Sequence, residues 1–296
     1  MGSDSGEGEI SRFEFDTQAE GYDLRTRLGE DAARAVADVV LGLGQEALDV
    51  SRPLVVLEVG AGTGEIGAWL ARASTYTGFD ASSRMLSAFE TRLASSETTA
   101  TLRVADANDP WPLADTSAEV VFFSRVLHLL DPRHVEQELR RVAGDDGLVV
   151  LAGRTQRDRS SRAAALRRML WTALEDRGFS PRRGERRASS FFEEMVSRGA
   201  IRLPAREAAT IEVVRSPLER LRAWRSKGGL GGLDLPRDER ARVLDEVEAR
   251  ARQTWSRLDE PERSAEVYVV EGALLSRRNS GSRPRRFGCS GADSRS

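Results

Sequence analysis

A glycine-rich turn directly after an apolar segment is the feature of this sequence with the clearest chemical meaning. Residues 54–59 are apolar except for Glu58, and Gly60, Gly62 and Gly64 follow at alternate positions. Glycine permits tight turning and lets main-chain N–H groups come close to a ligand. The pattern predicts a buried strand, a turn and the start of a helix, and it predicts that a nucleotide-type ligand binds there.

The glycine turn by itself leaves two classes of ligand open. Residues 62–67, Gly-Thr-Gly-Glu-Ile-Gly, also spell the GxGxxG pattern of nicotinamide-dinucleotide folds. Asp80 ends the next apolar run and is placed to accept hydrogen bonds from both hydroxyls of an adenosine ribose, which either ligand requires. Asp106 follows the third run, where its carboxylate can accept a hydrogen bond from the adenine amino group. This third acid argues against a dinucleotide.

Glu58 is an acid inside an otherwise apolar strand, two residues before the first glycine. A charge at such a position indicates a role. We expect Glu58 either to neighbour the ammonium group of a bound cofactor or to orient the glycine turn.

Strand-like and helix-like segments alternate through the first half of the chain, and they must position these acids. The expected strands are residues 54–59, 75–79, 101–104, 119–123 and 148–151, and the expected helices are residues 66–73, 83–93 and 134–142, with one more around residues 36–43. Strands that are apolar throughout are typical of sheets buried on both faces. The alternation predicts an α/β fold with a Rossmann-like, doubly wound, mostly parallel sheet, whose ligand lies beyond the carboxyl ends of the strands.

The second half of the chain has a different pattern. We expect helices at residues 162–176, 189–198, 217–225 and 237–258, and strands at residues 209–214 and 266–275. The two strands are expected to complete one edge of the sheet and to include an antiparallel edge strand. Residues 216–263 would then form a helical insertion, which is a candidate cover for a substrate.

Residues 57–153 resemble the methyltransferase domain of the small-molecule class I S-adenosylmethionine-dependent methyltransferases. The resemblance rests on the glycine turn, on Asp80 and Asp106, and on Val126-Leu127-His128, which matches a Leu-His segment of the family. It implies S-adenosyl-L-methionine as the cofactor, with the glycine turn around its methionine part, Asp80 at the ribose, and Asp106 with Ala107 at the adenine. The full set of implied cofactor contacts is Tyr22, Glu58, Gly60, Ala61, Gly62, Gly64, Asp80, Ala81, Asp106, Ala107 and Ser124.

Tyr22 belongs to residues 15–23, which resemble the N-terminal segment that folds over the cofactor in this family. Tyr22 would then help to close the site. The alternative is an aromatic residue that anchors a helix to the core, and the sequence leaves both interpretations open.

The resemblance also divides the chain. Residues 51–153 are expected to form the cofactor-binding core, and residues 13–50 to form helices that cover the cofactor. Residues 154–278 are expected to form a helical region on the acceptor side, together with the last two strands. Residues 1–12 and 279–296 lack apolar periodicity and are expected to be disordered.

The implied chemistry is direct transfer of a methyl group. The cofactor already activates its methyl group, so the protein mainly has to align the acceptor for in-line displacement and exclude water. A neutral hydroxyl or a protonated amine would still have to lose a proton, and the chain has two histidines, His128 and His134. His128 follows the fourth strand and is the candidate base. A packing or capping role is the alternative for it.

Missing residues argue against several other reactions. The segment after the fourth strand, residues 123–126, lacks the Asn/Asp-Pro-Pro-aromatic motif of enzymes that methylate exocyclic amines of bases. The single cysteine, Cys289, lies in the polar tail, which argues against a covalent thiol adduct and against disulfides. We find no grouping of ligands for a metal and predict none.

Composition limits the partners. A net charge of -2 in 296 residues argues against a protein that coats nucleic acid. The chain has no run of eighteen apolar residues, and residues 1–12 are acidic and rich in Gly and Ser, unlike the pattern expected of a signal peptide. We therefore expect a cytoplasmic protein with a small-molecule acceptor, without a membrane or nucleic-acid partner.

The alternatives that stay open concern the acceptor and the role of the chain. Arg154 to Arg187 contains eleven arginines and four acids, and this segment could bind RNA phosphates, an acidic carrier protein or an anionic small molecule, or could form a solvated face. Methylation of RNA or of a carrier-bound substrate, a non-catalytic cofactor-binding subunit and an NAD-dependent dehydrogenase are the competing functions.

Overall fold

The computed structural model describes residues 28–276, apart from residues 96–97, 145, 181–183, 227–228, 231–232 and 234 and the side chains of residues 184–189. The expected disordered ends, residues 1–12 and 279–296, lie outside the described residues. So do Tyr22 and the rest of residues 13–27 from the expected covering segment.

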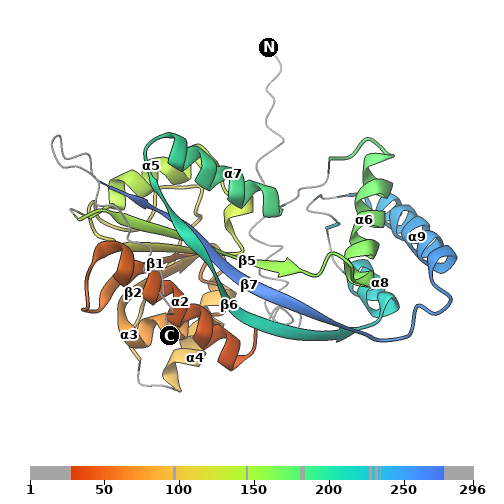
Figure 1. Cartoon of the computed structure of the whole chain (residues 1–296), viewed down its shortest axis with the longest axis horizontal. Helices are drawn as coiled ribbons and strands as arrows, with labels where there is room; N and C mark the ends of the chain where they lie inside the picture. Colours follow the sequence, from red (N-terminus) through yellow and green to blue (C-terminus); the bar gives the residue numbers. More distant parts are fainter. Residues whose placement is uncertain are drawn as a thin grey trace, which may run out of the picture.

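One sheet carries the fold. In the described part of the chain its seven strands have the order β3-β2-β1-β4-β5-β7-β6 (Figure 1). The strands are β1 (Leu54–Val59), β2 (Ser74–Asp80), β3 (Thr101–Val104), β4 (Val120–Ser124), β5 (Leu148–Arg157), β6 (Ile201–Arg215) and β7 (Glu262–Leu275). Strands β1 to β5 pair in parallel, and β7 runs antiparallel to both β5 and β6. The predicted Rossmann-like fold class is confirmed.

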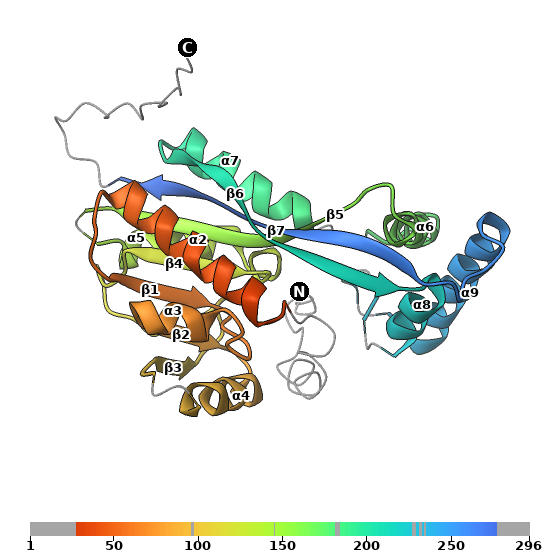
Figure 2. The same cartoon turned by 60° about the horizontal axis from the view of Figure 1, so that its bottom comes forward.

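Helices cover both faces of this sheet (Figures 1 and 2). One face carries α2 (Glu30–Leu48), α3 (Gly67–Ala73) and α4 (Ser83–Ala94), and the other carries the 3-10 turn η1 (Leu127–Leu129), α5 (Pro132–Val142) and α7 (Gly184–Ser197). Val56 and Phe122 are buried on the first face, and their chain neighbours Leu57 and Phe123 are buried on the second. Successive strand residues therefore enter opposite cores, which explains why these strands are apolar throughout.

Strand β6 begins at Ile201, whereas the sequence pattern predicts a strand only from residue 209. Pro204 hides this part of the strand in the sequence, because proline cannot donate a hydrogen bond to a neighbouring strand. The register of β6 against β7 shifts twice between residues 203 and 209. Because β6 is the edge strand, these irregularities accommodate the proline.

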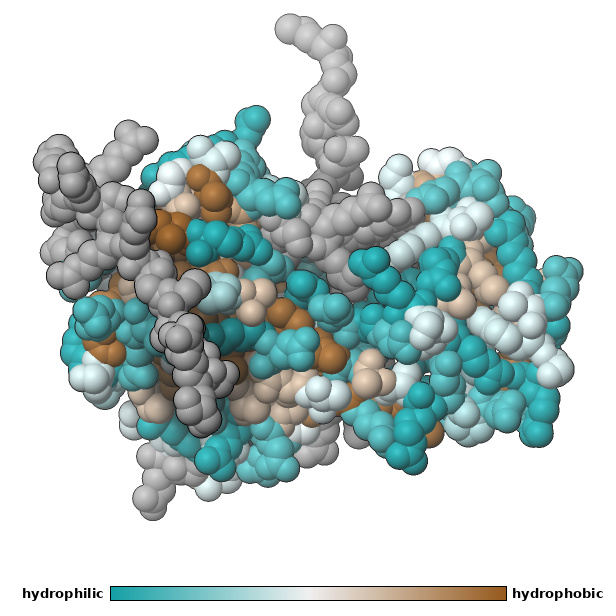
Figure 3. Space-filling model, viewed as in Figure 1, coloured by the Kyte–Doolittle hydropathy of each residue, from teal (hydrophilic) through white to brown (hydrophobic). Residues whose placement is uncertain are grey.

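Strands β5, β6 and β7 extend beyond the rest of the sheet and carry a separate group of helices (Figure 2). We call α6 (Arg162–Glu175), α8 (Pro217–Arg225) and α9 (Arg237–Thr254) the helical lobe. Leu166, Leu221 and Val243 are among the residues of its own apolar core, and hydrophilic residues predominate on its outer surface in Figure 3. The predicted insertion, residues 216–263, supplies α8 and α9, and the structure adds α6 to the same body.

Several described arginines of the segment from Arg154 to Arg187 pair with acids of other elements. The pairs are Arg154 with Glu271 at 3.1 Å, Arg157 with Glu266 at 2.8 Å, and Arg177 with Glu239 at 3.1 Å and with Glu246. These arginines therefore connect β5 to β7, and the turn after α6 to α9. Much of the charge of this segment is used within the fold.

Glu271 on β7 is a buried carboxylate, 3% exposed, that two arginines share. Its Oε1 accepts a hydrogen bond from Nε of Arg154 at 3.1 Å, and its Oε2 accepts one from Nη2 of Arg202 at 2.5 Å. The guanidinium of Arg202 also lies 5.1 Å from the centre of the Phe192 ring. The buried carboxylate thus joins three neighbouring strands through ion pairs with two arginines whose side chains are 28% and 38% exposed.

We expect Glu271→Ala to lower the free energy of unfolding by about 3 kcal/mol, because both arginines would lose their counter-charge in a partly buried place. Urea unfolding measures this change. Glu212→Ala is the control: it removes the exposed partner of Arg263 and should change stability by about 0.5 kcal/mol or less. Equal losses in the two variants would contradict a special role for the buried carboxylate.

The described residues contain neither a membrane-spanning helix nor a cluster of metal ligands. None of their helices combines the length and the apolar character that crossing a bilayer requires. Nor do they contain a group of three or more His, Cys, Asp and Glu side chains placed to hold a metal ion. The expectations about membrane partners and metals stay predictions.

Candidate cofactor-binding site

The glycine turn forms the loop between β1 and α3. Gly60, Gly62 and Gly64 have φ angles of 71°, 56° and 74°, in the left-handed region that glycine adopts without strain. The N–H groups of Gly60 and Ala61 both donate to the carbonyl oxygen of Phe79, at 2.9 and 3.0 Å. The loop is therefore held against the end of β2.

Asp80, the last residue of β2, ties the same loop to the start of α4. Its Oδ2 accepts a hydrogen bond from the N–H of Gly62, and its Oδ1 accepts one from the N–H of Ser82, both at 2.9 Å. Ser82 caps α4 by accepting from the N–H of Met85 at 3.2 Å, and Ala81 lies half-buried between the two. The carboxylate is thus fixed at the carboxyl edge of the sheet, where folds of this type bind their ligands.

Gly64 and Gly62 differ in what surrounds them. A Cβ atom on Gly64 would lie 2.0 Å from a ring carbon of Phe89, whereas a Cβ atom on Gly62 would meet no atom within 4 Å. Helix α4 therefore supports the loop at Gly64, while the main chain at Gly62 borders open space. These residues fit a cofactor that lies along the loop.

We expect Gly64→Ala to destabilise the protein far more than Gly62→Ala. The first substitution combines a left-handed backbone with a clash against Phe89, and it should lower the free energy of unfolding by about 3 kcal/mol or more. The second substitution only forces a left-handed backbone on alanine, and it should lower the free energy of unfolding by about 1 kcal/mol. Thermal unfolding of both variants measures the difference, and equal shifts would contradict the packing of Phe89 against the loop.

Glu58 is a buried acid on β1, two residues before Gly60. The residue is 2% exposed, and its Oε2 accepts a hydrogen bond from the hydroxyl of Tyr76 at 2.6 Å. Burial raises the pKa of Glu58 to about 8, against the opposing effect of the hydrogen bond from Tyr76. Both roles expected for this acid, orientation of the glycine loop and contact with an ammonium group of the cofactor, stay predictions.

Asp106 and Ala107 follow β3, the strand beside β2. The N–H of Ala105 donates to the carbonyl oxygen of Asp80 at 3.0 Å, which joins the two strand ends. Asp106 is half-buried. Ala107 is buried, and its carbonyl oxygen accepts from the indole N–H of Trp111 at 3.1 Å. The structure therefore brings Asp80 and Asp106 to neighbouring strand ends, and their contacts with a cofactor stay predictions.

Ser124, at the end of β4, has a partner that the sequence analysis missed. Its Oγ lies 2.8 Å from the hydroxyl of Tyr268 on β7, a fully buried residue. The tyrosine passes over Gly153 of the intervening strand β5, where a Cβ atom would lie 2.1 Å from the tyrosine oxygen. A glycine inside an apolar strand is a signal for such a close approach, but it does not say which side chain makes it.

The two histidines lie on different elements. His128 is half-buried in η1, which follows the end of β4 and packs against α7. His134 lies on α5, and its Nε2 is 2.8 Å from the carbonyl oxygen of Asp109. His128 is thus the histidine near the end of β4, and its role as a base stays a prediction.

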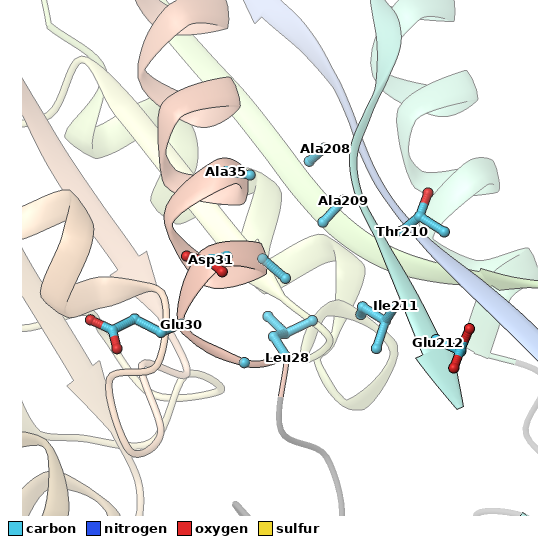
Figure 4. Close-up of a pocket in the computed structure, with 11 residues that line it drawn as sticks. Leu28, Glu30, Asp31, Ala35, Ala208, Ala209, Thr210, Ile211 and Glu212 are labelled. Atoms are coloured by element: carbon cyan, nitrogen blue, oxygen red, sulfur yellow. The ribbon is translucent and has the colours of Figure 1, made fainter. Parts of the chain in front are cut away.

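A pocket of about 450 Å³ lies between the start of α2 and strand β6 (Figure 4). The N-terminal end of α2 and residues 208–212 of β6 form its walls, and Leu28, Ala209 and Ile211 face the space between them. The N–H of Leu28 donates to Oε1 of Glu65, the residue directly after the loop, at 2.7 Å. This bond sets the pocket beside the end of the loop.

The fold and this edge of the sheet define the class of the protein. A parallel sheet with a left-handed glycine loop after β1, an acid at the end of β2 and an acid after β3 is a Rossmann-like ligand-binding domain. Residues 56–147, from β1 to the residue before β5, match the family model described as a methyltransferase domain. The predicted resemblance to methyltransferases is therefore confirmed for this part of the chain.

Solved structures with a similar chain trace share little sequence with the protein. The YcgJ protein of Bacillus subtilis is 14% identical, with a TM-score of 0.49, over 81% of this chain and 99% of its own. A SAM-dependent methyltransferase from Aquifex aeolicus is 12% identical, with a TM-score of 0.48, over 90% of this chain and 100% of its own. Similarity at this level carries no argument about function. The comparison with curated proteins finds no match.

Proposed function

We propose that this protein is an S-adenosyl-L-methionine-dependent methyltransferase that transfers a methyl group to a small-molecule acceptor by direct in-line displacement. The observation that carries the proposal is the arrangement of the glycine loop, Asp80 and Asp106 at neighbouring strand ends within the matched domain. The family match favours methyl transfer over the dehydrogenase that the GxGxxG pattern leaves open.

Each group at this edge would have its own task. The main chain of residues 60–64 would hold the methionine part of the cofactor, Asp80 with Ala81 the ribose, and Asp106 with the N–H of Ala107 the adenine. When bound, the cofactor supplies a methyl group that its sulfonium already activates. The chain has to align the acceptor atom and exclude water.

The end of β4 is where we expect the acceptor atom to lie. Ser124 is held there by Tyr268 at 2.8 Å, and His128 follows four residues later. We propose His128 as the group that accepts a proton when the acceptor is a hydroxyl or an ammonium group. Tyr22 would close the site from the N-terminal segment.

A small acceptor is favoured over RNA or a carrier-bound substrate, because Arg154, Arg157 and Arg177 pair with acids of the same chain. Phosphate binding would have to break these pairs. We propose residues 51–153 as the cofactor-binding core and residues 154–278 as the acceptor side. The cytoplasmic location stays a prediction.

Isothermal titration calorimetry of the full chain with S-adenosylmethionine, S-adenosylhomocysteine and NAD tests the proposal. We expect binding of both sulfur ligands at micromolar concentrations and no response to NAD. Tight binding of NAD without a response to either sulfur ligand would overturn the proposal in favour of hydride chemistry. Formation of S-adenosylhomocysteine with a low-mass metabolite fraction, compared with an RNA fraction, then tests the class of acceptor.

A further inference from the structure

The extended parts of β5, β6 and β7 present a face that runs from the N-terminal end of α2 to the helical lobe (Figure 2). Arg157 of β5 and Ile211 of β6 are both paired with Glu266 of β7. Because side chains alternate along a strand, these three residues share the face on which Tyr268 reaches Ser124. The proposed site of methyl transfer and the lobe are therefore connected by one continuous strand surface.

The length of β5 sets the scale of this surface. Gly153 is the register partner of Ser124 on β4, and β5 continues from there to Arg157. Four residues of an extended strand span about 13 Å. A molecule with its reacting atom near the end of β4 could therefore reach the lobe with its far end.

Arg220 of α8 lies near the far end of this face, and one nitrogen of its guanidinium has no hydrogen-bond partner among the described residues. Its side chain is half-buried, and its Nη2 atom is fully buried with no acceptor among the described residues. Burial lowers the pKa of Arg220, and the positive charges of Arg215 and Arg157 lower it further. The negative charges of Glu266 and Glu262 act in the opposite direction and raise this pKa. All four neighbours lie on the face described above, because Arg215 is the register partner of Glu262.

The two acids near Arg220 already have partners. Oε1 of Glu266 accepts from Nε of Arg157 at 2.8 Å, and the carboxylate of Glu262 accepts from the first two N–H groups of α6, at 2.9 and 3.3 Å. Arg220 and its two arginine neighbours carry three positive charges, and Glu262 and Glu266 carry two negative charges. The group as a whole therefore has one net positive charge. A buried guanidinium nitrogen without an acceptor is unfavourable unless an anion completes its hydrogen bonds.

The part of the face nearer α2 has a different character. Leu28, Ala209 and Ile211 line the pocket of about 450 Å³ beside the glycine loop. Val213 continues the same side of β6 towards Arg215. A molecule lying along the face would thus contact apolar side chains near the cofactor loop and a cation at the lobe.

We infer that Arg220 binds the anionic end of the methyl acceptor, and that this acceptor carries a carboxylate or a phosphate group. A planar guanidinium can bind two oxygens of either group at once. The inference rests on the proposed methyltransferase function for the identity of the ligand as acceptor. The anion site itself rests on the surroundings of Arg220.

Thermal unfolding of the full chain with model anions tests this site in the absence of cofactor. Phenyl phosphate and benzoate are the probes, and benzyl alcohol at the same ionic strength is the neutral control. We expect at least one anion to raise the unfolding temperature of the wild type in a saturable manner, and benzyl alcohol to have no effect. The apparent Kd for that anion should rise by about tenfold or more in Arg220→Gln.

Two further variants sharpen the test. Arg242→Gln changes an exposed arginine of α9, whose side chain is 67% exposed, and should bind the anion as the wild type does. Arg220→Lys keeps the charge without the planar fork and should bind with intermediate affinity. A larger response to phenyl phosphate would assign a phosphate acceptor, and a larger response to benzoate a carboxylate acceptor.

Ligand-free Arg220→Gln should unfold at the same temperature as the wild type or at a higher one, because it removes an unpaired charge. A lower unfolding temperature would show that Arg220 has a structural role and would overturn the inference. Failure of both anions to stabilise the wild type, or an equal response of Arg220→Gln, would overturn it as well. Because the assay contains no cofactor, its result is independent of the calorimetric test of the proposed function.

Discussion

Asp80→Ala should weaken the binding of S-adenosylhomocysteine by about 100-fold or more. The carboxylate accepts hydrogen bonds from Gly62 and Ser82 at 2.9 Å each, so its loss releases the glycine loop and removes the proposed acceptor for the ribose hydroxyls. A hydrogen bond to a charged group contributes about 1.5 to 3 kcal/mol. The loss of the two proposed bonds from the ribose hydroxyls therefore corresponds to a factor on the order of 100 in Kd. Isothermal titration calorimetry measures the change.

Asp38→Ala is the matched control for this experiment. Asp38 is an exposed acid on α2, and it lies 3.9 Å from Arg34 in a surface ion pair. Its removal changes the net charge by the same amount and should leave the affinity unchanged. Wild-type affinity in Asp80→Ala, with a circular dichroism spectrum like that of the wild type, would place the ligand elsewhere on the protein.

The stability of the protein should decline between about pH 5 and about pH 8 because of Glu58. The pKa of this buried acid is raised to about 8 from an ordinary value of 4.5, mainly by burial. In this window the folded state keeps a proton that the unfolded state has lost, so the contribution of Glu58 is complete below the unfolded pKa and is lost as the pH rises through the folded pKa. A shift of this size corresponds to at most about 4 to 5 kcal/mol.

Urea unfolding of the wild type and of Glu58→Gln at about pH 5 and about pH 8 tests this expectation. Glutamine can still accept a hydrogen bond from Tyr76 and cannot ionise, so the variant should lack this part of the decline. Glu119→Gln serves as the control, because Arg52 lowers the pKa of Glu119 and moves its titration below the window. Parallel stability profiles of the wild type and Glu58→Gln would show that Glu58 ionises normally.

The local part of the site could be predicted from the sequence because its signals are contiguous in the chain. Strands β1 and β3 have the predicted bounds, residues 54–59 and 101–104. A strand buried on both faces must be apolar throughout, and a left-handed turn after it requires glycine. The order of strand, glycine loop and acids therefore indicated both the Rossmann-like fold and the strand ends at which a cofactor would bind.

The sequence pattern was less informative where an element departs from regular geometry. Strand β6 begins at Ile201 because bulges accommodate Pro204 at an edge, and a rule that ends strands at proline places its start too late. Helix α6 belongs with α8 and α9 although β6 separates them in the chain. Amphipathic spacing indicates that a helix has a buried side, and it does not identify what covers that side.

By itself the sequence determined the fold class, the glycine loop and the acids at the ends of β2 and β3, because each depends on a short stretch of chain. Only the tertiary structure decided that Glu58 is buried beside Tyr76, that Tyr268 reaches Ser124, and that Nη2 of Arg220 lacks an acceptor among the described residues. Ser124 and Tyr268 are 144 positions apart. The protonation of a buried acid and the shape of an acceptor site depend on such distant neighbours, since burial and electric charge act through space and not along the chain.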